Sequence, residues 1–175
     1  MISKRNIFLI GPMGSGKTAV GKALARALHL SFVDSDAEIE RRTGVDITFI
    51  FEKEGEAGFR ERERDVIADL TSREDIVLAT GGGVVVNEAN RRHLAERGCV
   101  VYLQTSVAQQ LERTRHGKHR PLLVTEDPRA RLEALLIERE PLYREIADIT
   151  VSTDGRRVQL LADEVVRLLA ERAPA

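Results

Sequence analysis

One eight-residue segment near the N-terminus constrains the fold of this chain more than any other feature. Residues 11–18 read GPMGSGKT and match the pattern G-x-x-x-x-G-K-[S/T] in full. The short apolar stretch of residues 7–10 precedes the segment, and a sequence with helical spacing follows it from Ala19. Glycines allow the backbone to wrap a phosphate with its N–H groups, and the positive end of the following helix adds attraction. The sequence therefore predicts a phosphate-binding loop between a strand and a helix, rather than a glycine turn without a ligand.

Two side chains of this loop predict what the ligand carries. The Lys17 ammonium group supplies a positive charge for β- and γ-phosphates, and the Thr18 hydroxyl can ligate Mg²⁺. We therefore expect ATP with Mg²⁺ at this site. The predicted ATP-binding residues of the segment are Gly14, Ser15, Gly16, Lys17, Thr18 and Ala19.

Short apolar runs recur along the chain and alternate with helical patterns. They predict strands at residues 7–10, 31–33, 76–79, 100–103 and 149–151. Such alternation is typical of a parallel sheet that helices cover on both faces. We therefore expect an α/β fold of three layers, α/β/α, with a five-stranded parallel sheet. Together with the phosphate loop, this organisation resembles that of the P-loop nucleoside monophosphate kinases.

The length of 175 residues fits a single domain, residues 1–175, with two interruptions. About residues 34–73 carry more helical sequence than a crossover between strands needs, which predicts an inserted lobe; the family resemblance described below implies that this lobe binds the substrate. About residues 114–127 are polar and basic without clear periodicity, so we expect a mobile lid there. Lid closure over ATP would bring the charge of Arg120 to the transferred phosphate. His116 and His119 have a spacing seen in metal sites, but no cysteine or carboxylate cluster joins them, and we do not expect zinc.

The charge balance and the N-terminal sequence limit the partners of this protein. The 27 Lys and Arg residues against 28 Asp and Glu residues give a net charge of −1, which provides no field to attract nucleic acid or an anionic membrane. The apolar stretch of residues 7–10 is shorter than a signal-peptide core or a membrane span. The single cysteine, Cys99, lies in an apolar run and is expected to be a buried thiol. We expect a cytoplasmic monomer that binds neither nucleic acid nor membranes.

Acidic residues and glycines follow the second and third predicted strands. Asp34 and Asp36 are two positions apart, and in an extended segment such residues point to the same side. Both carboxylates would then face the phosphate loop at the carboxyl edge of the sheet. The alternative is that one of them caps the helix that follows. Gly81, Gly82 and Gly83 offer backbone N–H groups to a substrate oxygen or a metal-bound water, unless they form only a flexible turn.

Two arginines stand out by their positions in helical patterns. Arg139 falls within an apolar stripe that includes Leu135 and Leu142, where a charge is costly without a partner. That partner is either an anionic ligand or an internal carboxylate in a buried ion pair. Arg60 lies three residues before Glu63, near enough on a helix for the carboxylate to hold the guanidinium. The alternative for Arg60 is a solvated, charged helix face.

Taken together, these motifs resemble the ordered motif set of the shikimate kinases. The matching segments are residues 11–18, 34–36, 59–60 with Glu63, 80–83, 120–123 and 139–143, and the likeness spans residues 6 to about 153. The resemblance implies an enzyme that transfers the γ-phosphoryl group of ATP to the 3-hydroxyl of shikimate. The products would be 3-phosphoshikimate and ADP, in the biosynthesis of chorismate and the aromatic amino acids.

The resemblance also implies how the substrate is held and attacked. The shikimate-binding residues would be Asp36, Arg60, Gly81, Gly82, Gly83 and Arg139. Both arginines would face the substrate carboxylate, which suits their fork-like donors. The catalytic residues would be Lys17, Asp36 and Arg120. Asp36 would accept the hydrogen bond of the substrate hydroxyl, while the two cations neutralise charge on the transferred group.

The metal and the adenine base would have their own residues. By the same resemblance, Thr18 would ligate Mg²⁺ directly and Asp34 would act through water. Arg113 resembles the arginine with which this family contacts adenine. Arg156 lies in a segment similar to the adenine loop of the family.

Two other functions would share the phosphate loop. A kinase for gluconate or a nucleoside monophosphate would also have a lid, although a nucleotide acceptor usually needs a base-sized pocket, and only 4% of the residues here are aromatic. A regulatory module would bind Mg-ATP without transferring a phosphoryl group. Asp36 and Arg139 argue against the regulatory module, because it would not need them.

Overall fold

A parallel sheet forms the centre of the computed structural model, which describes residues 5–115 and 125–172. Within these ranges five strands pair in the order β2-β3-β1-β4-β5, all parallel. The strands are β1 (Ile7–Ile10), β2 (Ser31–Asp34), β3 (Ile76–Ala79), β4 (Cys99–Gln104) and β5 (Ile149–Ser152). Each agrees with a predicted strand to within one residue at either end, so the predicted sheet is confirmed.

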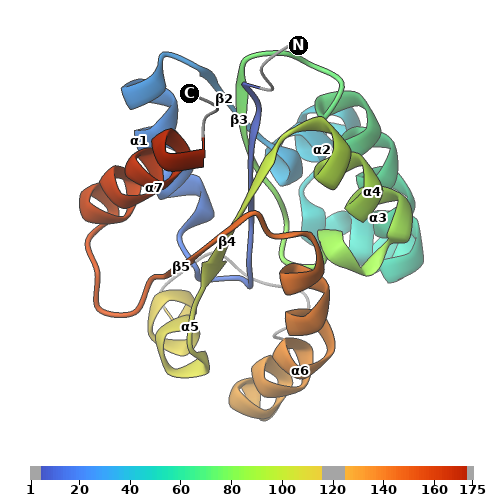
Figure 1. The fold of residues 1–175 in the computed structure, drawn as a ribbon. Helices are drawn as coiled ribbons and strands as arrows, with labels where there is room; N and C mark the ends of the chain where they lie inside the picture. Colours follow the sequence, from blue (N-terminus) through green and yellow to red (C-terminus); the bar gives the residue numbers. More distant parts are fainter. Residues whose placement is uncertain (1–4, 116–124, 173–175) are drawn as a thin grey trace.

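Helices cover both faces of the sheet and complete the three predicted layers (Figure 1). They are α1 (Lys17–Leu28), α2 (Ser35–Thr43), α3 (Ile47–Leu70), α4 (Glu88–Arg97), α5 (Val107–Thr114), α6 (Pro128–Ile146) and α7 (Val158–Arg172), with a short 3₁₀ helix η1 (Val84–Val86). Helices α1 and α7 pack on one face, and α2, α3, α4 and α6 pack on the other. In the described part of the chain, no helix is both long and apolar enough to cross a membrane.

The central strands are apolar at every position because both of their faces are buried. In β1, Phe8 and Ile10 belong to the core beneath α3 and α6, whereas Ile7 and Leu9 belong to the core beneath α1 and α7. All four side chains are at most 5% exposed. This double burial produces the short continuous apolar runs by which the strands can be recognised in the sequence.

The strand order brings three segments together at one edge of the sheet. Because β3 lies between β2 and β1, the segments after these strands, residues 11–16, 35–36 and 80–83, leave the sheet as neighbours. Thr80 joins two of them, since its N–H and its hydroxyl both donate to the carbonyl oxygen of Leu9, at 3.2 and 2.8 Å. Ligands of open parallel sheets bind at this carboxyl edge.

Helices α2 and α3 occupy the segment between β2 and β3, where the sequence predicts an inserted lobe. α2 begins at Ser35, directly after β2, because Asp34 is its N-cap. Asp36 is therefore helical, and the expected extended segment of residues 34–36 is wrong. Helix α3 is kinked at Gly55, whose φ of 72° and ψ of −178° are not helical. Across this kink Arg62 donates to the carboxylate of Glu54 at 2.7–3.1 Å.

Candidate active site

Residues 11–16 form the loop between β1 and α1, and the backbone of this loop requires glycine. Gly14 and Gly16 have φ angles of 79° and 90°, which other residues rarely adopt. Helix α1 begins at Lys17 without a side-chain cap. Its first N–H groups are thus left for an anion, which the helix dipole also attracts. The loop therefore has the local geometry of a phosphate cradle.

The side chain of Lys17 folds back over this loop. Its Nζ donates to the carbonyl oxygens of Gly11, at 2.6 Å, and Pro12, at 2.9 Å. The hydroxyl of Ser15 lies 3.4 Å from the same nitrogen. These contacts keep the ammonium group at the loop, within reach of a phosphate that the loop would hold.

Thr18 and Asp34 meet at the start of helix α1. The Thr18 hydroxyl donates to Asp34 Oδ2 at 3.1 Å, while Asp34 Oδ1 accepts from the N–H of Ala37 at 3.0 Å. Asp34 is thus both a helix cap and a neighbour of the phosphate loop, so the two alternatives for this aspartate hold together.

This pair of oxygen donors suits Mg²⁺, which prefers hard oxygen ligands and often binds through one or two protein groups together with phosphates and water. The described residues hold no group of three or more His, Cys, Asp or Glu side chains that could bind a metal ion. Phosphate oxygens of the nucleotide and water would have to supply the remaining ligands. Thr18 and Asp34 therefore fit a magnesium ion that accompanies a nucleotide.

Residues 81–83, which we call the glycine strip, follow β3 and lie beside the start of α2. The N–H of Gly81 donates to the hydroxyl of Ser35 at 3.3 Å. A Cβ placed on Gly81 would stand 3.0 Å from Oδ1 of Asp36. The Asp36 carboxylate thus faces the strip even though it belongs to a helix, because that helix begins at the same edge of the sheet.

Arg60 projects from α3 to the far end of the strip. Its Nη1 donates to Oε1 of Glu63 at 2.8 Å, and a Cβ on Gly83 would overlap its guanidinium. The Glu63 side chain is only 1% exposed and that of Arg60 is 20% exposed, so this pair is not a solvated charged face. Burial raises the pKa of Glu63 above its usual value, and the charges of Arg60 and Arg139 offset this effect only in part.

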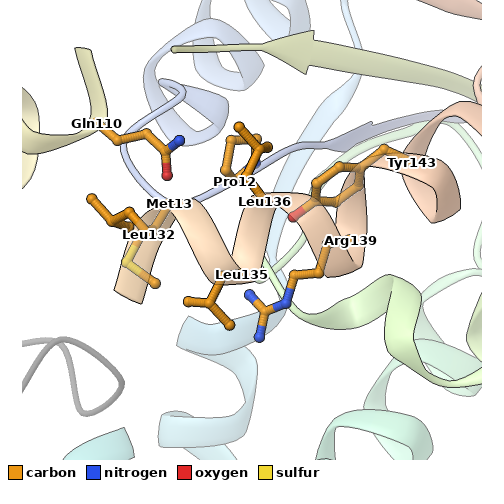
Figure 2. A pocket seen from close by; sticks show the side chains of 8 residues that line it. All are labelled: Pro12, Met13, Gln110, Leu132, Leu135, Leu136, Arg139 and Tyr143. Atoms are coloured by element: carbon orange, nitrogen blue, oxygen red, sulfur yellow. The ribbon is translucent and has the colours of Figure 1, made fainter. Parts of the chain in front are cut away.

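Arg139 projects from α6 and is almost fully buried, with 5% of the residue exposed. Figure 2 shows it with Leu135 and Tyr143 around a small cavity that Pro12 and Met13 of the phosphate loop also line. Among the described residues, Arg139 forms no ion pair with a carboxylate, and its Nε has no hydrogen-bond partner. Within the described ranges, Arg139 is therefore not part of an internal ion pair, which was the alternative to an anionic ligand.

The glycine strip touches both sides of the site. A Cβ on Gly82 would stand 3.3 Å from the backbone nitrogen of Met13 in the phosphate loop and 3.6 Å from Nη1 of Arg139. The phosphate loop, the strip and the two guanidinium groups are therefore contiguous. A phosphate held by the loop would adjoin a pocket suited to a small anion.

The two arginines expected near adenine lie in different surroundings. Arg113, on α5, donates to the carbonyl oxygen of Gly14 at 3.1 Å and thus lies against the phosphate loop. Arg156 contacts the carbonyl oxygen of Ser152 at 3.2 Å and forms an ion pair with Glu164 of α7. The structure therefore joins Arg113 to the site, whereas the contacts of Arg156 lie within the β5 and α7 region.

Some predicted features lie outside the described residues, and two residues of the site were not predicted. Arg120, His116 and His119 belong to the undescribed part of the predicted lid. Ser35 contacts the glycine strip, and so does Tyr143, whose hydroxyl donates to the carbonyl oxygen of Gly82. Tyr143 belongs to the segment 139–143 that resembles the family, but no local pattern indicates its contact with Gly82, which is 61 residues away in the sequence.

Comparisons with known proteins bear on the same residues. A family model described as Shikimate kinase matches residues 13–170. The shikimate kinase of Vibrio campbellii is 55% identical over 172 residues, which cover 98% of this chain and 100% of that protein. The shikimate kinase of Methylococcus capsulatus is 66% identical over 153 residues, covering 87% and 86% of the two chains.

A solved structure agrees with the sequence comparisons. The shikimate kinase of Acinetobacter baumannii, determined in complex with shikimate, superposes with a TM-score of 0.94 at 52% identity, covering 97% of this chain and 95% of that one. The family model includes most of the phosphate loop, the glycine strip and both Arg60 and Arg139. This chain belongs to the shikimate kinase family.

Proposed function

We propose that this protein transfers the γ-phosphoryl group of ATP to the 3-hydroxyl of shikimate and releases 3-phosphoshikimate and ADP. The main support for this proposal is that the phosphate loop adjoins the glycine strip, and that Arg60 and Arg139 lie along this strip. Membership of the shikimate kinase family supports it. The relative from Acinetobacter baumannii, which binds shikimate, has nearly the same fold.

The acceptor side of the site suits a small carboxylic acid. Arg60 and Arg139 each present a planar fork of donors, which matches the two oxygens of a carboxylate. A carboxylate between them would also compensate the buried charge of Arg139, which has no ion-pair partner in the ranges that the structure describes. We assign shikimate binding to these arginines, to Asp36 and to the backbone of the glycine strip.

The donor side suits the phosphates of ATP. The backbone of residues 14–19 would surround the β- and γ-phosphates, and Lys17 and Arg113 would add positive charge. We retain Arg156 as a candidate for contact with the adenine end of the nucleotide, beyond the loop. Arg120, in the undescribed segment, stays a candidate for charge stabilisation at the transferred group.

Thr18 and Asp34 would hold a magnesium ion, with the aspartate acting through water. The ion would supply positive charge to the phosphate oxygens as the reaction proceeds. Asp34 also caps helix α2, which carries Asp36, and so it links the ion site to the acceptor site.

Asp36 would orient and activate the acceptor. Its carboxylate lies beside Gly81 and can accept a hydrogen bond from the substrate hydroxyl, which then faces the γ-phosphate in line with the leaving group. Phosphoryl transfer needs mainly alignment and charge stabilisation, so no covalent intermediate with the enzyme is required. The hydroxyl proton would pass to Asp36 as the new P–O bond forms and the bond to ADP breaks.

Release of ADP in the presence of different acceptors tests this proposal. A coupled assay with Mg-ATP is run with shikimate, gluconate or AMP, and without an acceptor. We expect release to depend on shikimate and to be at the background level with the other two. Faster release with gluconate or AMP would contradict the acceptor that we propose, and ATP binding with no acceptor-dependent release would favour a regulatory module.

We also propose that the protein acts as a monomer, because its charges are balanced and large apolar side chains are buried in the two cores on either side of the sheet. Light scattering coupled to size-exclusion chromatography should give a mass near 19.5 kDa. A mass near twice this value would show a dimer instead.

A further inference from the structure

Tyr143 is a buried residue that has no role in the reaction proposed above. It lies on α6, one turn after Arg139, and its exposed fraction is 0%. Its ring stacks on that of Tyr102, with the ring centroids 5.0 Å apart. Its hydroxyl donates a hydrogen bond to the carbonyl oxygen of Gly82, in the middle of the glycine strip.

This hydrogen bond orients more than one atom of the strip. Because the peptide bond is planar and trans, the carbonyl of Gly82 and the N–H of Gly83 lie in one plane and point in opposite directions. A hydroxyl that holds the carbonyl therefore also sets the direction of the Gly83 N–H. The N–H of Val84 donates to the carbonyl oxygen of Gly81 at 3.1 Å and closes a turn around this peptide, and the Tyr143 hydroxyl adds a contact from outside the turn that further limits the freedom of the three glycines.

Arg139 and Tyr143 reach the strip from the same helix. Nη1 of Arg139 is 3.6 Å from the position of a Cβ on Gly82, and Figure 2 shows both side chains projecting from α6. Burial raises the pKa of Tyr143 well above its ordinary value, and the nearby Arg139 offsets this only in part. The phenol therefore stays protonated and remains a hydrogen-bond donor across the working pH range.

We infer that Tyr143 is a positioning residue for the acceptor substrate, because its hydroxyl fixes the Gly82 carbonyl and thereby aims the Gly83 N–H between Arg60 and Arg139. The inference rests on the proposed function, since it concerns the same acceptor site. The hydroxyl donates to the glycine strip and not to the phosphate loop, so we expect its loss to affect binding of the acceptor far more than binding of ATP.

Tyr102 provides a matched control for this role. It is equally buried and forms the other half of the aromatic stack, but its hydroxyl contacts Glu140 and not the strip. Tyr143→Phe and Tyr102→Phe each remove one buried hydroxyl and keep the stacked rings. A purely structural role of the stack would affect both variants alike.

The test compares steady-state kinetics of the two variants with those of the wild type, together with their melting temperatures. A lost hydrogen bond of ordinary strength corresponds to about a fivefold change in equilibrium. We expect Tyr143→Phe to raise KM for shikimate about fivefold or more, with KM for ATP and kcat at saturating shikimate within about twofold of the wild type. Tyr102→Phe should leave KM for shikimate unchanged.

Three results would overturn the inference. They are an unchanged KM for shikimate in Tyr143→Phe, an equal rise in Tyr102→Phe, and an equal rise in KM for ATP. Tyr143→Met, which also lacks the hydroxyl, is the second variant and should repeat the shift if Tyr143→Phe does not fold. A wild-type protein without shikimate-dependent ADP release would reject the proposed function itself, and the inference with it.

Discussion

The guanidinium of Arg139 occupies a place that is unfavourable for a charge without a ligand. Only 5% of the residue is exposed, and apolar residues of α6 surround it. In the parts of the chain that the structure describes, Glu63 acts on it only through its charge and no carboxylate forms an ion pair with it. A buried cation without an ion-pair partner costs stability, so we expect that Arg139 serves to bind a ligand and not to stabilise the fold.

Replacing Arg139 by Ala should therefore weaken binding of shikimate far more than binding of ATP. Loss of a buried, charged hydrogen-bonding partner corresponds to about 2 kcal/mol or more, which is about a 30-fold increase in the dissociation constant for shikimate. Equilibrium titrations with each ligand measure both constants. Arg129→Ala, at an exposed position on the same helix, is the control and should change neither. A larger loss of ATP affinity than of shikimate affinity would contradict the assigned pocket.

Lys17 should matter for turnover and not for folding. Removing a group that stabilises developing charge lowers kcat by about 100-fold or more, so Lys17→Met should be nearly inactive. Its melting temperature should stay close to that of the wild type, because the side chain lies at the phosphate loop, where it donates to the carbonyls of Gly11 and Pro12, and belongs to neither core cluster. Lys22→Met, on the exposed side of the same helix, is the matched control. Normal turnover in a folded Lys17→Met protein would show that the assigned role is wrong.

The residues of the site differ in how well the sequence could predict them. Lys17 belongs to a loop pattern whose geometry is local, and the apolar stripe around Arg139 is also a local signal. The sequence could place Asp36 near the phosphate loop. It could not show that Asp36 lies in a helix, because an aspartate after a short strand is compatible with either a strand end or a helix start. The contact of Tyr143 with Gly82 could not be predicted, although residues 139–143 resemble a family motif, because the packing of α6 against the sheet edge brings the two residues together.

Helix α3 is the element whose shape departs most from a simple pattern. Its sequence from Ile47 to Leu70 continues through a sharp kink at Gly55, where φ is 72° and ψ is −178°. This backbone region is almost confined to glycine. A glycine within a helical pattern is tolerated in straight helices too, so the pattern alone could not show the kink.

Replacing Gly55 by Ala should lower stability through backbone strain alone. A Cβ at this position would meet nothing within 4 Å, so no clash contributes. Forcing a side chain into this backbone region costs about 1–3 kcal/mol, which urea unfolding should detect as a lower midpoint with the same slope. Glu52→Ala, an exposed change in the same helix, should stay within about 0.5 kcal/mol of the wild type. Equal stability of Gly55→Ala and the wild type would mean that the kink is not required.

The ion pairs that Glu38 forms with Arg41 and Arg42 within α2 should be sensitive to acid. The hydrogen bond from Arg41 lowers the pKa of Glu38 from 4.5 to about 2, against burial, and Arg42, which also pairs with Asp69 of α3, adds to the effect. A lowered folded-state pKa stabilises the fold above pH 4.5, and this contribution is lost as the pH falls toward 2.

The difference in unfolding free energy between the wild type and Glu38→Gln should therefore shrink over that pH interval. Urea unfolding at a series of pH values measures it, with Glu52→Gln as an exposed control. A difference that stays constant down to pH 2 would contradict this source of stability.

At the scale of the whole molecule, the sheet explains why distant motifs form one site. The order β2-β3-β1 brings together the ends of strands that are separated by up to 70 residues of sequence. The central strands β1 and β3 could be predicted because double burial makes them apolar throughout, and alternation with helices predicts parallel pairing. The position of the glycine strip against Met13 could not be predicted, because it depends on how two loops pack after the sheet has formed.

The central claim is that ATP and shikimate react directly with each other across this edge of the sheet. Phosphorus NMR of a reaction with Mg-ATP and shikimate, followed by mass spectrometry of the acceptor, tests it most directly. The account predicts that ADP and a phosphate monoester at the 3-hydroxyl of shikimate appear in equal amounts. Inorganic phosphate with unmodified shikimate, or a phosphate on another hydroxyl, would contradict it.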